Sequence, residues 1–118
     1  MATKDELGKY GEQLAAQHLE ALGYTILDRN WRCPQGELDI VALDAGEFVF
    51  AEVKTRSSIS FGHPITAVTP QKLGRLRRLS ASWCGSHPGP HNRTRIDVIG
   101  ILLPRSAPME IDHLRRVF

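Results

Sequence analysis

The segment 36–56, GELDIVALDAGEFVFAEVKTR, limits the possible folds of this chain more than any other segment. Apolar and β-branched residues dominate both of its halves, and Ala45–Gly46 separates them at the spacing of a tight hairpin turn. We therefore predict antiparallel strands at about 37–43 and 47–55.

Charged residues interrupt these apolar strands. If Ala45–Gly46 forms a two-residue turn, Asp39 lies opposite Glu52, and Glu37 lies opposite Lys54 on the same face. The alternation then places Leu38 on the other face of the hairpin. A three-residue turn with a glycine bulge is the alternative, and a slip of one residue would move Asp39 to the opposite face.

Asp39 and Glu52, held opposite each other, repel unless a cation lies between them or one of them takes up a proton. Mg²⁺ or Mn²⁺ fits such a site, because a hard cation prefers oxygen ligands and fills its remaining positions with water and substrate phosphate. Lys54 would then contact the phosphate or the attacking water. Such a site suits phosphodiester hydrolysis, whereas the alternative is a cross-strand salt bridge on an exposed edge.

The remaining elements predict an α/β fold. Thr3 and Glu6 have the spacing of a capping box for a helix from about Lys4 to Leu22, which Gly23 ends. Thr69 and Pro70 begin a second helix. Further strands are expected at 24–31, 95–103 and 109–114, and a mobile loop with a short extended piece at 55–68. We expect a mixed sheet of about five strands flanked by two main helices.

Size and composition favour a single domain over residues 1–118 of an ordinary globular protein, with 42% hydrophobic and 24% charged residues. The charged start MATKDELGKYGE does not fit a signal peptide, and no apolar run is long enough to span a bilayer. We therefore expect a cytoplasmic protein without a membrane partner. Cys33 and Cys84 are expected as reduced thiols.

Five ordered blocks of the sequence resemble a known family. They are YGEQLAAQHLEALGY, NWRCPQGELDIVA, VFAEVKTR, FGHPITAVTPQK and RIDVIG. In this order they resemble the YraN-like family, uncharacterised family UPF0102. GELD followed by EVK also resembles the D…ExK core of the PD-(D/E)xK nuclease superfamily, with its restriction-endonuclease-like fold, although Gly36–Leu38 stands where many of these nucleases carry proline. The family is itself similar to archaeal Holliday-junction resolvases.

The resemblance implies a catalytic core of Asp39, Glu52 and Lys54, with Glu12 as an additional acidic member. Asp39, Glu52 and Glu12 would hold the metal. In mid-helix, Glu12 could equally be a solvated surface residue.

Basic residues near this core are candidates for phosphate contact. The set comprises Arg32, Arg56, Lys72, Arg75, Arg77 and Arg78. The members in 72–78 could instead be the solvated face of an amphipathic helix. Arg29 and Trp31 could add a basic, stacking surface.

Three other patterns have simpler interpretations. Cys84, His87 and His91, with Cys33, have a spacing that could hold zinc, but a loop with solvated histidines is the favoured interpretation. Asp97 is expected to pair with Arg95 or a neighbouring basic residue at a strand end. The serines at 57, 58 and 60 lack His and Asp partners for nucleophilic catalysis.

Two functional hypotheses follow. The first is a Mg²⁺- or Mn²⁺-dependent endonuclease that acts on nucleic acid, with DNA as the expected partner and branched or structured DNA suggested by the resolvase similarity. The alternative is a nucleic-acid-binding or protein-adaptor module that keeps the nuclease fold without activity. Symmetric cutting would require two active sites, which makes a homodimer attractive.

Overall fold

The sheet and its two main helices follow the predicted order. A computed structural model of the chain describes residues 3–60 and 62–118. Its elements are α1 (Lys4–Ala21), β1 (Thr25–Cys33), β2 (Gly36–Asp44), β3 (Glu47–Arg56), the 3-10 helix η1 (Pro64–Ala67), α2 (Pro70–Ser86), β4 (Thr94–Leu102) and β5 (Glu110–Leu114). The strands form one five-stranded sheet in the order β1-β2-β3-β4-β5. Strands β3 and β4 are parallel and the other neighbours are antiparallel, so the predicted mixed α/β sheet is confirmed.

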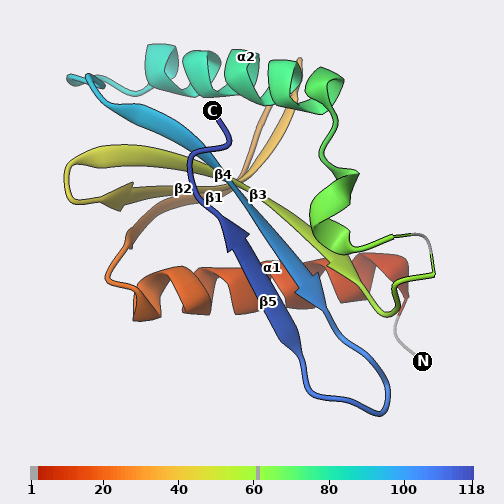
Figure 1. The fold of residues 1–118 in the computed structure, drawn as a ribbon. Coiled ribbons are helices and arrows are strands. Elements are labelled where there is room, and N and C mark those ends of the chain that lie inside the picture. The colour runs from red at the N-terminus through yellow and green to blue at the C-terminus, as the bar shows by residue number, and fades with distance from the viewer. Residues whose placement is uncertain (1–2, 61) are drawn as a thin grey trace.

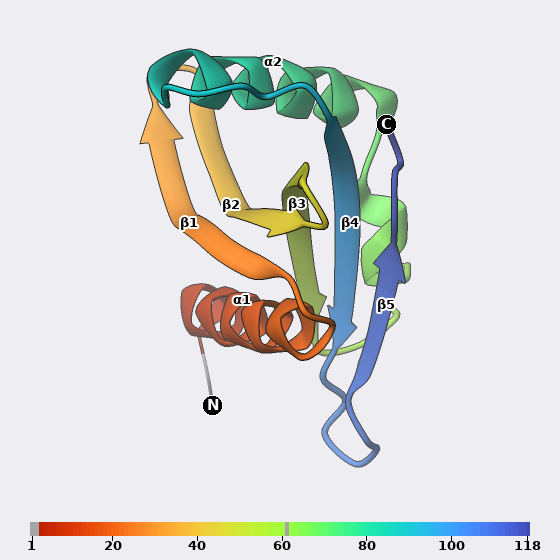
Figure 2. The same ribbon diagram turned by 90° about the vertical axis from the view of Figure 1, so that its left-hand side faces the viewer.

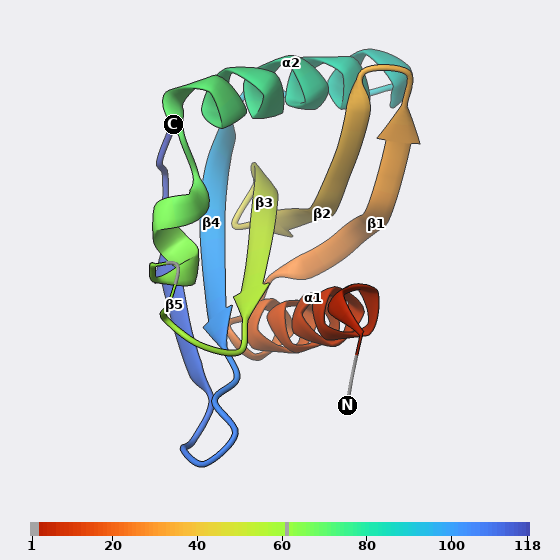
Figure 3. The ribbon, with the colours of Figure 1, turned by 90° about the vertical axis from the view of Figure 1, so that its right-hand side faces the viewer.

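The two helices lie on opposite sides of a twisted sheet (Figure 1). In the two side views, β1 and β2 curve from α1 toward α2 (Figures 2 and 3). The curved parts of β1 and β2 thus extend from α1 to α2, and the candidate active site lies along them. Neither helix in the described part of the chain has the length and apolar character needed to cross a bilayer.

Helix α1 begins and ends as its sequence predicts. The Thr3 hydroxyl accepts a hydrogen bond from the Glu6 N–H at 3.1 Å, and the Thr3 N–H donates to the Glu6 carboxylate at 3.4 Å. Gly23 follows the last turn with φ 93°, a conformation that costs glycine little. The capping box therefore fixes where the helix starts.

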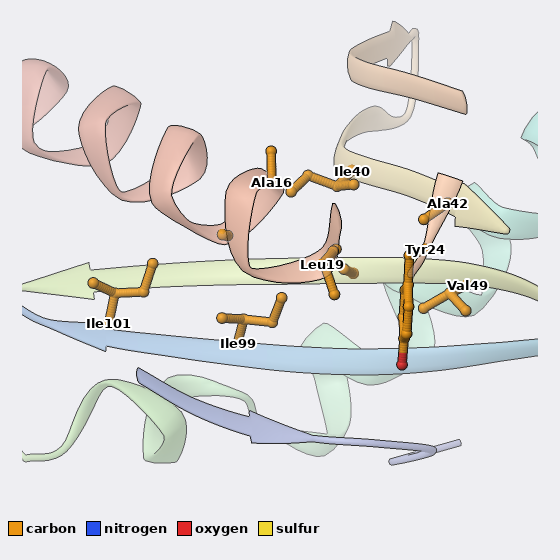
Figure 4. Packing of buried hydrophobic residues seen from close by; sticks show 10 residues of the cluster. Ala16, Leu19, Tyr24, Ile40, Ala42, Val49, Ile99 and Ile101 are labelled. Carbon is orange, nitrogen blue, oxygen red and sulfur yellow. The ribbon is translucent and has the colours of Figure 1, made fainter. Parts of the chain in front are cut away.

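One hydrophobic cluster packs α1 against the sheet (Figure 4). Its fully buried members include Leu19 from α1, Ile40 from β2, Val49 from β3 and Ile99 from β4. Burying side chains of this size contributes roughly 1.5–3 kcal/mol each, before the conformational entropy cost of folding. This packing anchors the helix that carries Glu12.

Gly11 sets how closely α1 approaches β3. A Cβ atom at this position would overlap the Thr55 side chain. Only glycine lets the two backbones come this close, and the contact brings the next residue, Glu12, to the sheet. The glycine therefore serves the candidate site as well as the packing.

A second hydrophobic cluster packs α2 against the other face. It joins Leu76, Leu79 and Trp83 of α2 to Val41 and Phe50 of the sheet. The amphipathic character considered for this helix is therefore present in the structure.

The hairpin turn has the predicted length. Ala45 and Gly46 have φ 49° and 83°, and the pairs run from Asp44↔Glu47 to Ile40↔Ala51. Positive φ at both central residues is the signature of a type I′ turn, whose twist matches that of the strands. The two-residue turn is confirmed over its bulged alternative.

The segment before α2 differs from the prediction. The expected short extended piece at 55–68 is instead the 3-10 helix η1, which packs over β4 where Gly100 leaves room for Pro64 and Ile65. Pro64 at the first position of η1 favours this tight turn. Phe61 lies outside the described residues.

Candidate active site

Strands β2 and β3 separate at the predicted catalytic residues. Their ladder ends at the pair Ile40↔Ala51. One residue further, the Asp39 carboxylate accepts a hydrogen bond from the Val53 N–H at 2.8 Å. Asp39 thus takes the place of a backbone carbonyl as the partner of Val53, which holds this carboxylate between the two strands.

The alternation of β2 changes at the same point. Leu38 is buried with Val41 and Phe50 in the α2 cluster, so its predicted place on the opposite face is wrong. In β1 the pairs Arg29↔Ile40 and Trp31↔Leu38 are formed, and the intervening residue Asn30 has φ 53°. The left-handed conformation of Asn30 thus lies next to the altered alternation of β2, between the two pairs that flank Asp39.

Three carboxylates converge on the α1 side of this distortion. Glu12, Glu37 and Asp39 each offer an oxygen, and these oxygens all lie within 4.8 Å of one another. The predicted register placed Glu37 opposite Lys54, but the Arg32 Nε donates to its carboxylate at 2.8 Å instead. Glu37 is therefore the member that the sequence interpretation missed.

Glu52 approaches Asp39 from the opposite side. It lines a cavity of about 210 Å³ with Asp39, Lys54 and Lys72, next to a larger groove of about 1020 Å³. Asp39 and Lys54 line both, whereas Glu12 lines only the groove. The acid cluster thus comprises Glu12, Glu37, Asp39 and Glu52.

Burial and mutual repulsion perturb the acid cluster. Burial, reinforced by Asp39 and Glu37, raises the pKa of Glu12 to about 7. Burial and hydrogen bonding with Asp39 raise the pKa of Glu52 to about 9. In the metal-free protein these carboxyl groups therefore hold protons at neutral pH that a divalent cation would displace.

Lys54 lies beside the acid cluster, as predicted. Burial lowers the pKa of its ammonium group, and the nearby cations Lys72 and Arg56 lower it further. A lysine in such surroundings is a good contact for a phosphate oxygen or a proton donor to it.

The predicted phosphate-contact residues lie in different places. Arg32 lines the groove, Lys72 lines the smaller cavity, and Arg75 is close enough to lower the pKa of Glu52. Arg77 instead stacks on the Phe118 ring, 3.8 Å from its centroid, and lines a separate cavity on the C-terminal side of α2. Its assignment to the substrate surface is therefore not supported.

The two remaining predicted phosphate contacts are Arg56 and Arg78. Arg56 ends β3 two residues after Lys54, and Arg78 is exposed on α2. The groove adds cations that the sequence interpretation did not assign to phosphate contact. They are Lys4 and Lys9 of α1. Arg29, predicted as part of a basic surface, also lines the groove.

The zinc spacing does not form a site. Within residues 3–60 and 62–118, a group of three or more metal-ligating side chains comes together only at Glu12, Glu37 and Asp39. His87 stacks on Trp83 with ring centroids 4.0 Å apart, and Cys33 and Cys84 are free thiols. The predicted loop with solvated histidines is also wrong in part, because Cys84 lies in α2 and the rings of His87 and His91 pack on Trp83.

Asp97 has the structural role predicted for it. It is fully buried, and its carboxylate accepts a hydrogen bond from Arg95 Nε at 2.9 Å and one from the Arg116 N–H at 3.0 Å. Arg95 also donates to Glu47 at 2.9 Å. The charges here are matched within the protein, so no external ion is needed.

Comparison with known proteins identifies the family. Residues 11–101 match the uncharacterised protein family UPF0102. The chain belongs to this family. A UPF0102 protein of Beutenbergia cavernae is 52% identical over 117 residues, covering 99% of each chain. One from Clavibacter michiganensis subsp. michiganensis is 47% identical over 115 residues (98% of each chain), and one from Paenarthrobacter aurescens is 52% identical over 117 residues (99% of this chain and 97% of the relative).

The matched region contains every member of the acid cluster and Lys54. The family description names no activity, so the chemistry of this UPF0102 protein has to be inferred from its site.

Proposed function

We propose that this UPF0102 protein is a metal-dependent endonuclease that hydrolyses phosphodiester bonds in DNA. The observation that carries the proposal is the place of Asp39. Its carboxylate lies between Glu12 and Glu52, which come from different elements, and Lys54 lines the cavities on both sides.

The donor set fits Mg²⁺ or Mn²⁺. Asp39, Glu52 and Glu12 would hold the cation, and Glu37 adds a further oxygen ligand on the groove side. A hard cation bound here would lower the pKa of a water molecule and balance the negative charge that builds up during phosphodiester hydrolysis. The raised pKa values of Glu12 and Glu52 support this assignment, because carboxyl groups forced together without a counter-charge gain most from a cation.

Lys54 supplies the positive charge of the protein itself at this point. Its ammonium group can donate hydrogen bonds to a non-bridging phosphate oxygen and orient an attacking water. Lys72 and Arg75, whose charges act on Glu52, would hold a neighbouring phosphate on the α2 side.

The groove suits a polymer rather than a small metabolite. It is open and about 1020 Å³ in volume, at the upper end for small-molecule sites, and Lys4, Lys9 and Arg29 line it. A strand could therefore contact cations on both sides of the acid cluster. A homodimer would supply two such sites for cutting both strands of a branched duplex.

The test compares cleavage of single-stranded, duplex, flap and four-way DNA in Mn²⁺ by wild type, Asp39→Ala and Lys54→Ala. Glu110→Ala and Arg105→Ala are matched controls, because both residues are exposed and neither lines the groove or the smaller cavity. We expect cleavage by wild type and both controls, and a loss of at least about 100-fold in the site variants.

Equal cleavage by all proteins would mean a contaminating nuclease and would contradict the proposal. DNA binding without cleavage in any metal would instead favour the adaptor module.

A further inference from the structure

We infer that Asn30 is a positioning residue that holds Glu12 in the acid cluster. This inference rests on the proposed metal-dependent function, for which Glu12 must face Asp39. Asn30 lies in β1 and belongs to neither the predicted catalytic core nor the predicted phosphate contacts.

The Asn30 side chain bridges two carboxylates. With its amide nitrogen toward them, it donates to Glu12 Oε1 at 2.9 Å and to Glu37 Oε1 at 3.1 Å. The neighbours favour this orientation, because in the other one the amide oxygen would face acceptors and the amide nitrogen would face donors. Both protons of the amide therefore serve the acid cluster.

The backbone of Asn30 makes this bridge possible. Its φ of 53° lies in the left-handed region, which asparagine adopts more readily than most residues with a side chain. In a regular strand, neighbouring side chains point to opposite faces. Here Arg29 donates to Gln13 at 3.1 Å while Asn30 donates to Glu12, so two consecutive β1 residues contact two consecutive residues of α1.

A neutral donor suits this position. A lysine or arginine between Glu12 and Glu37 would neutralise them and weaken the attraction for a divalent cation. The amide holds the same oxygens in place and leaves their negative charge available. The Arg32–Glu37 ion pair fixes the other oxygen of Glu37, so Asn30 connects Glu12 to an anchored group.

The first experiment measures Mn²⁺ binding by isothermal titration for wild type and Asn30→Gly. Glycine accepts φ of 53° and removes only the amide, so the variant should keep the melting temperature of wild type within a few degrees. We expect Mn²⁺ affinity to fall by roughly tenfold, the usual scale for losing an outer partner of a metal ligand. Asn30→Ser is a second amide-free variant if Asn30→Gly does not fold.

The second experiment tests whether Asn30 acts through Glu12. In a Glu12→Gln background, Asn30→Gly should change Mn²⁺ affinity by less than about twofold, because the ligand that it positions is already lost. A merely structural role would give the same loss in both backgrounds.

The outcomes are distinguishable. Failure of wild type to bind Mn²⁺ would overturn both the proposed function and this inference. Normal Mn²⁺ binding by wild type and by the amide-free variants would overturn the inference alone, as would equal losses with and without Glu12→Gln.

Discussion

Two groups of charged residues lie within this small domain, and they are built in opposite ways. In the paired cluster, Arg95 and Arg116 contact the carboxylates of Glu47 and Asp97 at 2.7–3.0 Å. In the acid cluster, carboxylates face carboxylates, Glu37 alone has a direct ion pair among the described residues, with the exposed Arg32, and the amide of Asn30 supplies hydrogen bonds but no charge.

The pKa values show the difference between the two clusters. Burial alone would raise the pKa of Asp97, but hydrogen bonds from His113 and Arg95 lower it to about 2. For Glu12 and Glu52, burial and the neighbouring acids act in the same direction, and the pKa values rise to about 7 and about 9. The paired cluster thus stabilises the fold, whereas the carboxylates of the acid cluster repel one another unless they hold protons or, as proposed, a cation.

The largest expected effect is on the paired cluster. Asp97→Asn removes a fully buried charge from Arg95 and leaves the arginine with fewer partners, which should lower the free energy of unfolding by roughly 3–5 kcal/mol. Urea unfolding of the metal-free protein measures this. A loss below about 1 kcal/mol would mean that the remaining acids Asp44 and Glu47 are sufficient for Arg95.

The second-largest effect is expected at the contact between α1 and β3, which also positions Glu12 in the acid cluster. Gly11→Ala forces α1 away from Thr55, which should cost up to about 3 kcal/mol of stability and also move Glu12 away from Asp39. We expect weaker Mn²⁺ binding in calorimetry at a temperature where the variant is still folded. Gly8→Ala is the control, because a Cβ there meets no atom within 4 Å. Equal behaviour of the two variants would contradict the role of the Gly11 contact.

The two clusters should respond oppositely to pH. The folded-state pKa of Asp97 lies below its usual 3.8, so about 2 kcal/mol of stability is present above pH 4 and is lost as the pH falls toward 2. Glu12 and Glu52 have raised pKa values, so their contribution is complete below about pH 4.5 and is lost as the pH rises through 7 and 9.

The metal-free protein should therefore be most stable on the acid side of neutrality, between about pH 4 and 6. Thermal unfolding from pH 2 to 9 in the presence of a chelator measures this profile. Glu52→Gln should flatten the alkaline part and leave the acid part unchanged. A wild-type protein that gains stability between pH 6 and 9 would contradict the assignment of the acid cluster.

The smallest expected change in stability accompanies a large change in metal binding. Asp39→Asn removes repulsion but also weakens the hydrogen bond to the Val53 N–H, so the free energy of unfolding should change by no more than about 1 kcal/mol. Mn²⁺ should raise the melting temperature of wild type but not of this variant. Equal stabilisation of both by Mn²⁺ would place the cation elsewhere.

Much of the fold could be predicted because local signals agree with the tertiary structure. The capping box at Thr3, the type I′ turn at Ala45–Gly46 and the apolar stripe of α2 each depend on residues close in sequence. The 3-10 helix η1 was missed because its packing over Gly100 joins segments that are far apart in the chain.

The site could be predicted only in part. The proximity of Glu52 and Lys54 follows from alternation along β3. Asp39 was predicted opposite Glu52, but it reaches the site where the ladder has ended and the alternation of β2 has changed. The roles of Glu37 and Asn30 could not be found in this way, because they depend on a change of alternation in two neighbouring strands. An asparagine in a strand before an acidic hairpin is a weak signal for such a change, since Asn is depleted in strands.

The separation of β2 from β3 also divides the site into parts of unequal mobility. Strand β3 remains paired with β4 from Phe48 to Arg56, so Glu52 and Lys54 belong to continuously hydrogen-bonded backbone. On the N-terminal side of Ile40, β2 is hydrogen-bonded to β3 chiefly through the Asp39 side chain. If a strand of nucleic acid binds as proposed, we expect the arm formed by β1 and β2 to move more than β3, and its backbone amides to exchange with solvent faster than those of β3.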